Sequence, residues 1–196
     1  MKRYPDIYVL RHGETEWNAE GRMQGDLNSP LTVRGIEHAR AQRRILERRD
    51  LTGFEVRVSP LGRAIETAGI AVAPLVRSLT TDPALREIGV GDWAGCRRDE
   101  LSLDTKAMQV TEDGVLALYQ EAPGGEGFDG LAQRCEGVLD ALQGPSILVT
   151  HGITSRMLRA LYLGLGPEGL HDLPGGQGVV YFLSGDRHDR LTDEGR

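Results

Sequence analysis

The sequence predicts an α/β protein built on a mostly parallel sheet that helices cover on both faces. Short apolar runs, which suit strands, alternate along the chain with longer helical patterns, and this alternation is typical of parallel sheets. The length of 196 residues and the 39% of hydrophobic residues are ordinary for one domain with a sizeable core. No run approaches the roughly 18 consecutive apolar residues of a membrane span.

Each element of the first half is marked by an apolar run or a helix-capping residue. Ser or Thr at an N-cap accepts a hydrogen bond from the first helical turn, and proline at the first helical position strengthens such a start. In order, we expect a buried strand at residues 6–10, a helix from the N-cap Thr32 to about Arg49, a strand at residues 55–58, a helix that starts at the cap Ser59 with Pro60 and stops at Pro74, and a short strand near residues 79–81.

The second half repeats this alternation. After the turn residues 124–127, apolar side chains recur at spacings of three and four residues, so Cys135 is expected on the buried face of a helix. The polar residues 184–196 are expected to be partly frayed. In order, we expect that helix, a buried strand at residues 146–149, a helix that follows Thr150-His151-Gly152, and a last strand at residues 179–183, after which Gly185-Asp186 can turn a hairpin.

Two histidines, His12 and His151, each follow a predicted buried strand and each precede a glycine. Ligands bind at the carboxyl ends of strands in open α/β sheets, so both should face one crevice. Arg11 precedes the first histidine, and Arg63 lies in the first turn of a predicted helix, where free N–H groups favour anions. Guanidinium groups match phosphate oxygens, and a neutral imidazole can attack phosphorus. These residues predict a phosphoryl pocket that needs no metal, and the sequence has no HExxH, EF-hand or Walker A motif.

These residues also resemble a known family. The segment Arg11-His12-Gly13-Glu14-Thr15 resembles the signature of the histidine phosphatase superfamily, the phosphoglycerate mutase-like proteins. The resemblance spans residues 6 to about 183 and implies a three-layer α/β/α fold, with one domain over residues 1–196 and a helical, lid-like segment at about 97–125. Further matching segments follow in the family's order at Gln24-Gly25 and at residues 30–32, 59–68, 85–95, 123–126 and 149–152.

The resemblance implies a role for each matching residue. His12 would be the nucleophile that becomes a phosphohistidine, and Glu87 would give a proton to the leaving oxygen and later help to activate water. Arg11, Arg63 and His151 would complete the phosphate pocket. No metal or cofactor is implied. The remaining expected substrate contacts are Asn18, Gln24, Gly25, Arg98 and Gly152.

Three functions stay open at this point. The first is a metal-independent phosphatase of the histidine acid type, which hydrolyses a small phosphorylated metabolite. The second is a mutase that depends on 2,3-bisphosphoglycerate, and the third is a slow or inactive regulatory protein that binds a phosphorylated ligand. We favour the phosphatase because residues 87–91 lack the Arg and Tyr of the mutase pattern, and because Lys106 is the only cation between Thr105 and Gly124.

Composition narrows the expected partners. The net charge of −6 argues against nucleic acid, although residues 40–49 are rich in arginine. The first residues lack the apolar core of a signal peptide, and Cys96 and Cys135 form no CxxC pair. We therefore expect a cytoplasmic monomer or homodimer whose partner is a small phosphorylated metabolite, without a membrane association.

Overall fold

The computed structural model describes residues 3–101 and 112–194. Within these ranges, six strands form one sheet in the order β3-β2-β4-β1-β5-β6. The strands β1, β2, β3 and β4 run parallel, whereas β5 and β6 are antiparallel to their neighbours. The mostly parallel sheet is therefore confirmed. The strands are β1 Ile7–Arg11, β2 Glu55–Val58, β3 Thr80–Thr81, β4 Ser146–Thr150, β5 Val180–Ser184 and β6 Arg187–Leu191.

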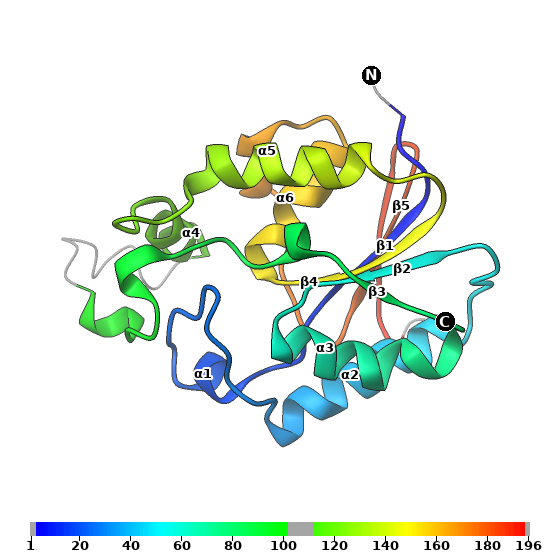
Figure 1. The fold of residues 1–196 in the computed structure, drawn as a ribbon, viewed down its shortest axis with the longest axis horizontal. Coiled ribbons are helices and arrows are strands. Elements are labelled where there is room, and N and C mark those ends of the chain that lie inside the picture. Colours follow the sequence, from blue (N-terminus) through cyan, green and yellow to red (C-terminus); the bar gives the residue numbers. More distant parts are fainter. Residues whose placement is uncertain (1–2, 102–111, 195–196) are drawn as a thin grey trace.

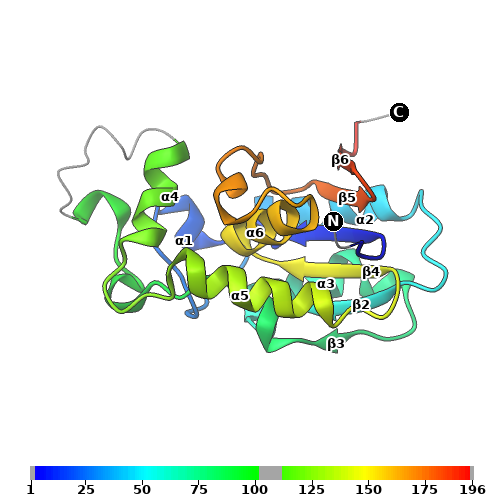
Figure 2. The same cartoon turned by 90° about the horizontal axis from the view of Figure 1, so that it is seen from above.

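Helices cover both faces of the sheet, so the three-layer prediction is also confirmed. Figures 1 and 2 show α2 and α3 against one face and α5 and α6 against the other, with α1 and α4 beyond one end of the strands. The helices are α1 Glu16–Ala19, α2 Val33–Leu46, α3 Gly62–Ala71, α4 Glu112–Gln120, α5 Gly127–Asp140 and α6 Gly152–Tyr162, and single 3₁₀ turns lie at Ala73–Leu75, Pro83–Leu85, Gly91–Trp93, Arg98–Glu100 and Pro167–Leu170.

Alternate residues of the central strands divide the core into two parts. Ile7 and Val9 of β1 pack into the cluster that includes α5 and α6, whereas Tyr8 and Leu10 pack into the cluster beneath α2 and α3. Successive side chains of a strand point to opposite faces, so a nearly continuous apolar run fills both clusters. Cys135 is fully buried in the first cluster, as its place in the apolar stripe predicts.

Two sequence predictions about element boundaries are wrong. The helix expected to start at Pro60 begins at Gly62, and its N-cap is Leu61 rather than Ser59. The Ser59 hydroxyl accepts from the N–H of Leu61 at 3.3 Å, before the helix begins, and lies 2.7 Å from the His151 ring. Within the segment expected to be partly frayed, residues 187–191 form β6, which pairs with β5 along its whole length. The turn expected at Gly185-Asp186 connects these two strands. An edge strand with one solvated face tolerates polar side chains, and the polar composition of this segment concealed the strand.

Within the described residues, four of the five arginines at positions 40–49 pair with acidic side chains. Arg43 pairs with Glu47 at 2.8 Å, and Arg44 and Arg48 both reach Asp193 of the C-terminal segment. Exposed pairs of this kind contribute little stability, but they engage most of the arginines that suggested a polyanion partner. No helix in the described ranges is long and apolar enough to cross a bilayer.

Candidate active site

The two strand-end histidines lie side by side because β1 and β4 are parallel neighbours. Arg11 is in register with Thr150, so the next residue of each strand, His12 or His151, lies at the same edge of the sheet. Their ring centroids are 5.1 Å apart, and both side chains are buried. The sheet thus places both imidazoles in one cluster, as their strand-end positions predict.

His12 is held as one neutral tautomer. Its Nδ1 lies 2.7 Å from the carbonyl oxygen of Gly13, which can only accept, so Nδ1 carries the hydrogen. Its Nε2 faces the Nε–H of Arg63 at 3.3 Å and therefore carries a lone pair. Burial, followed by the charges of Arg11 and Arg63, lowers the pKa of His12 well below its usual 6.5. Nε2 is consequently an unprotonated nitrogen near neutral pH.

Backbone carbonyls fix the guanidinium of Arg63. Nη1 donates to Leu27 O at 2.6 Å and Nη2 donates to Gly25 O at 2.8 Å. Gly25 has a φ of +50°, a conformation that favours glycine. Gly25 therefore acts through its carbonyl group, which holds Arg63 beside His12.

Arg11 lies against the N-terminus of α6. A Cβ atom on Gly152 would come within 3.2 Å of the Arg11 Cζ, so glycine at this position leaves space for the guanidinium. Within the described residues, the buried Nε of Arg11 and the buried Nδ1 of His151 have no hydrogen-bond partner. Unpaired buried polar atoms cost about 1–3 kcal/mol each, and a bound anion would satisfy them.

His151 is positioned by β2 as well as β4. Its Nε2 lies 2.7 Å from Ser59 Oγ, at the end of β2. Burial, and then the charges of Arg63, His12 and Arg11, lower the pKa of His151 well below its usual value. The ring is therefore neutral in the free protein.

The side chain of Glu87 lies against the N-terminus of α6, and only 6% of the residue is exposed. Its Oε1 accepts from the backbone N–H of Thr154 at 3.1 Å and lies 3.0 Å from the hydroxyl of the same residue, which is also 2.8 Å from Arg86 O. Its Oε2 accepts from the N–H of Ile153 at 3.3 Å. The free N–H groups of a helix N-terminus stabilise a carboxylate, so the helix that follows His151 also orients Glu87.

The loop that carries Glu87 is attached to α5. Arg134 donates from Nη1 to Ala84 O at 2.7 Å and to Arg86 O at 2.9 Å. Its Nε and Nη2 each lie 2.7 Å from a carboxylate oxygen of Glu126. Because these carbonyls directly precede Glu87 in the chain, Arg134 fixes the course of its loop.

Asn18 and Gln24 meet at Thr15. Asn18 closes the capping box of α1: its N–H donates to Thr15 Oγ1, and its Oδ1 accepts from Thr15 N. Gln24 donates from Nε2 to Thr15 Oγ1 at 2.8 Å, and its buried Oε1 has no partner within the described residues. Both side chains therefore belong to one network in the loop that follows the nucleophile.

Arg98 is not hydrogen-bonded to the histidine cluster within the described residues. Its Nε donates to Gly21 O at 3.1 Å, and with Leu118 of α4 it lines a cavity of about 280 Å³. The side chain of Tyr119, also on α4, is electrostatically coupled to the cluster: burial and then Glu87 raise its pKa. Residues 102–111 of the expected lid-like segment lie outside the described residues.

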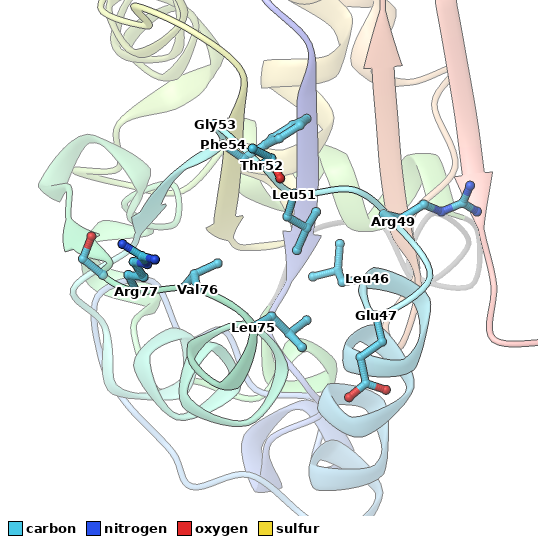
Figure 3. A pocket seen from close by; sticks show the side chains of 11 residues that line it. Leu46, Glu47, Arg49, Leu51, Thr52, Gly53, Phe54, Leu75, Val76 and Arg77 are labelled. Carbon is cyan, nitrogen blue, oxygen red and sulfur yellow. The ribbon is translucent and has the colours of Figure 1, made fainter.

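A larger cavity of about 600 Å³ lies elsewhere (Figure 3). Leu46, Leu51 and Leu75 converge on it, whereas Arg49 points away. It also includes Phe54, the residue before β2 begins, so it lies at the amino end of that strand. Catalytic sites of parallel sheets lie at the opposite, carboxyl end, and we assign the chemistry to the histidine cluster.

Sequence patterns do not single out several residues that build this site. Thr154, Thr67 and Arg134 carry no motif by themselves, and Ser59 resembles a helix cap. Thr67 accepts from the N–H of Gly13 at 3.0 Å. In the described ranges, no group of three or more histidine, cysteine, aspartate or glutamate side chains is arranged to hold a metal ion.

The fold and this cluster define a phosphoryl-transfer class, and comparison with known proteins identifies it. The chain belongs to the histidine phosphatase superfamily (branch 1), whose family model matches residues 7–192. It is 35% identical over 170 residues to the "probable phosphoglycerate mutase GpmB" of Enterobacter sp. (strain 638). This alignment covers 81% of this chain and 75% of that protein.

Solved structures of both activity types resemble the chain. A mycobacterial glucosyl-3-phosphoglycerate phosphatase in complex with VO3 superposes with a TM-score of 0.76 at 30% identity and covers 96% of this chain and 98% of its own. A phosphoglycerate mutase from Thermus thermophilus superposes with a TM-score of 0.71 at 32% identity, over 95% and 98% of the two chains. The family is therefore established, and the function to assign to this chain is either that of a phosphatase or that of a mutase.

Proposed function

We propose that this chain hydrolyses a small phosphomonoester through a phosphohistidine on His12 and that the reaction needs no metal. The observation that carries this proposal is the fixed tautomer of His12. Its Nδ1–H is directed to Gly13 O, and its Nε2 lone pair lies beside the Nε–H of Arg63. A neutral imidazole held in this way is a nucleophile that needs no separate base.

In the first step, Nε2 of His12 attacks phosphorus while the bond from phosphorus to the ester oxygen breaks. This step requires the protonated form of Glu87, which gives its proton to that leaving oxygen as the alcohol departs. Arg11, Arg63 and His151 stabilise the negative charge on the remaining phosphoryl oxygens. The hydrogen of Nδ1 stays directed to Gly13 O throughout, so the phosphorylated ring is cationic and a good leaving group.

In the second step, water attacks phosphorus and gives a proton to the Glu87 carboxylate. The bond between phosphorus and Nε2 breaks, and its electron pair returns to His12. Phosphate leaves, and the enzyme is regenerated with Glu87 protonated. The N–H groups of Ile153 and Thr154 hold the Glu87 side chain in place and stabilise the carboxylate form that accepts this proton.

The phosphatase activity is favoured over the mutase by the residues around the acid. The segment 87–91 lacks the Arg and Tyr of the mutase pattern, and Arg98 donates to a backbone carbonyl. The mutase is a second candidate, because relatives of both names match the chain. The paired arginines of α2 favour a small phosphorylated metabolite, rather than nucleic acid, as the partner. We propose a cytoplasmic location.

The test is phosphate release from a panel of sugar phosphates, phosphoglycerates, nucleotides and α-ribazole phosphate, with EDTA present. We expect release by the wild type and by His171→Ala, an exposed histidine outside the cluster. His12→Ala should lose the activity and the alkali-stable, acid-labile phosphoprotein. Isomerisation of a phosphoglycerate without net release would favour the mutase. Phosphate binding with no turnover would favour a regulatory protein, and activity that survives His12→Ala would refute the mechanism.

A further inference from the structure

Gln177 connects the nucleophile to Asn18. It lies in the loop between the 3₁₀ turn Pro167–Leu170 and β5, far in sequence from both residues. Its Nε2 lies 3.3 Å from the carbonyl oxygen of His12 and 3.3 Å from Oδ1 of Asn18. An amide NH₂ group has two hydrogens, so these two acceptors use both of them.

The same contact determines how the amide of Asn18 is oriented. Its Oδ1 accepts from the backbone N–H of Thr15 at 3.2 Å and from Gln177 Nε2. A carbonyl oxygen has two lone pairs, so this oxygen is fully used. The Nδ2 of Asn18 has no hydrogen-bond partner within the described residues, and its two hydrogens are available to a ligand.

The loop around Gln177 is shaped to keep it in place. Gly176 and Gly178 on either side have φ values of +142° and +72°, which other residues rarely adopt. A Cβ atom on Gly178 would come within 3.1 Å of the His38 ring. The buried Gln42 attaches the same region to the nucleophile strand, because its Nε2 donates to Arg11 O at 2.8 Å and to Val179 O at 3.1 Å.

We propose that Gln177 is a positioning residue for phosphoryl binding: it holds Asn18 Oδ1 and so directs the Asn18 Nδ2 hydrogens to a phosphoryl oxygen. The inference rests on the proposed function, in which Asn18 contacts the phosphoryl group. The inference depends on which end of the Asn18 amide, the nitrogen or the oxygen, faces the phosphoryl group. Without the donor from Gln177, Oδ1 of Asn18 keeps only the N–H of Thr15, so the amide is held by one contact fewer and turns more readily to present its oxygen, which repels an anion.

Two substitutions separate this role from a simple attachment of the loop. Gln177→Leu removes both donors at similar volume. Gln177→Glu keeps the size but places a carboxylate beside two acceptor oxygens, so it should drive the Asn18 amide to turn its nitrogen away from the ligand. Gln133→Leu, at an exposed position on α5, is the matched control.

The probes are inorganic phosphate and orthovanadate, whose dissociation constants are measured by calorimetry, together with kcat and KM for para-nitrophenyl phosphate. Loss of one hydrogen bond to a charged group corresponds to a factor of about 10 to 100. We expect Gln177→Leu and Asn18→Ala each to weaken phosphate binding by about that factor, and Gln177→Glu to weaken it further. The double variant Gln177→Leu/Asn18→Ala should bind no more weakly than Asn18→Ala alone.

If Gln177 had only a structural role, Gln177→Leu would lower the thermal stability, and its effect on phosphate binding would multiply with the effect of Asn18→Ala. Independent effects of the two substitutions would overturn the inference. Phosphate binding by Gln177→Leu that equals the wild type and the Gln133→Leu control would also overturn it. In both cases the proposed function survives, because the wild type still binds and hydrolyses. A wild type that binds neither anion and hydrolyses no ester overturns the proposed function and this inference together.

Discussion

Among the ion pairs of the described residues, Arg134–Glu126 is the most buried, and removing the Arg134 side chain should destabilise the protein strongly. Arg134 and Glu126 have only 11% and 16% of their side chains exposed, and they form two hydrogen bonds of 2.7 Å. In Arg134→Met, the carboxylate of Glu126 keeps only the N–H of Gly89 at 3.2 Å, and the carbonyls of Ala84 and Arg86 lose a donor.

The expected cost follows from this geometry. Breaking a buried ion pair by removing one partner costs about 3–5 kcal/mol. Because both groups retain some solvent contact, we expect the lower end, about 3 kcal/mol. For a chain of this size, each kcal/mol lowers Tm by roughly 2–4 °C, so Tm should fall by about 6–12 °C. The loop of Glu87 also loses its attachment to α5, so kcat should fall in the same variant.

Urea unfolding of the wild type, Arg134→Met and Arg134→Met/Glu126→Gln measures the effect. The double variant should regain much of the stability that Arg134→Met loses, because no unpaired carboxylate remains. Burial acts to raise the pKa of Glu126, but hydrogen bonds and charge from Arg134 outweigh it, and the pKa lies below its usual 4.5. The contribution of the ion pair to the free energy of unfolding is therefore complete above pH 4.5. It is lost as the pH falls through the lower, folded-state pKa of Glu126, so the stabilities of the wild type and Arg134→Met should converge in acid.

An Arg134→Met variant within about 1 kcal/mol of the wild type at neutral pH would refute this reasoning. A double variant as unstable as the single one would refute the part assigned to Glu126.

Two further predictions concern packing and pH. A Cβ atom on Gly13 would clash with the carbonyl oxygen of Gly35, so Gly13→Ala should cost about 3 kcal/mol or more. Gly69→Ala, at an open position of α3, should instead stabilise by about 0.5–1 kcal/mol, and equal urea midpoints for the two variants would contradict the packing argument. His12 and His151 have pKa values well below the unfolded value of 6.5, so below pH 6.5 the unfolded chain binds more protons than the native one. Stability should then fall with pH by up to about 1.4 kcal/mol per unit for each histidine. Urea unfolding across this range checks the slope, which should be shallower in His12→Gln, and an unchanged slope in that variant would count against a neutral, buried His12.

Local sequence signals located most of the elements but misplaced two boundaries. The run at β1 and the stripe of α5 are strongly periodic, and both elements lie where these patterns predict them. The start of α3 was misplaced because Ser59 has the residue type of a cap, whereas its hydroxyl accepts from Leu61 before the helix begins and contacts His151, 92 positions further along the chain. The hairpin turn at Gly185-Asp186 was expected, but the extent of β6 was not, because its polar side chains carry no apolar alternation and its pairing with β5 defines it.

The sequence by itself determined the class of fold, the family and the residues that form the histidine cluster. Apolar runs identify buried strands, and the strand ends of a parallel sheet converge, so His12 and His151 could be paired without coordinates. Only the tertiary structure decided how these groups are held: the tautomer of His12, the attachment of the Glu87 loop by Arg134, and the contact from Gln177 to Asn18. Each of these depends on the hydrogen bonds that the folded chain brings together, and no local pattern encodes the direction of a distant donor.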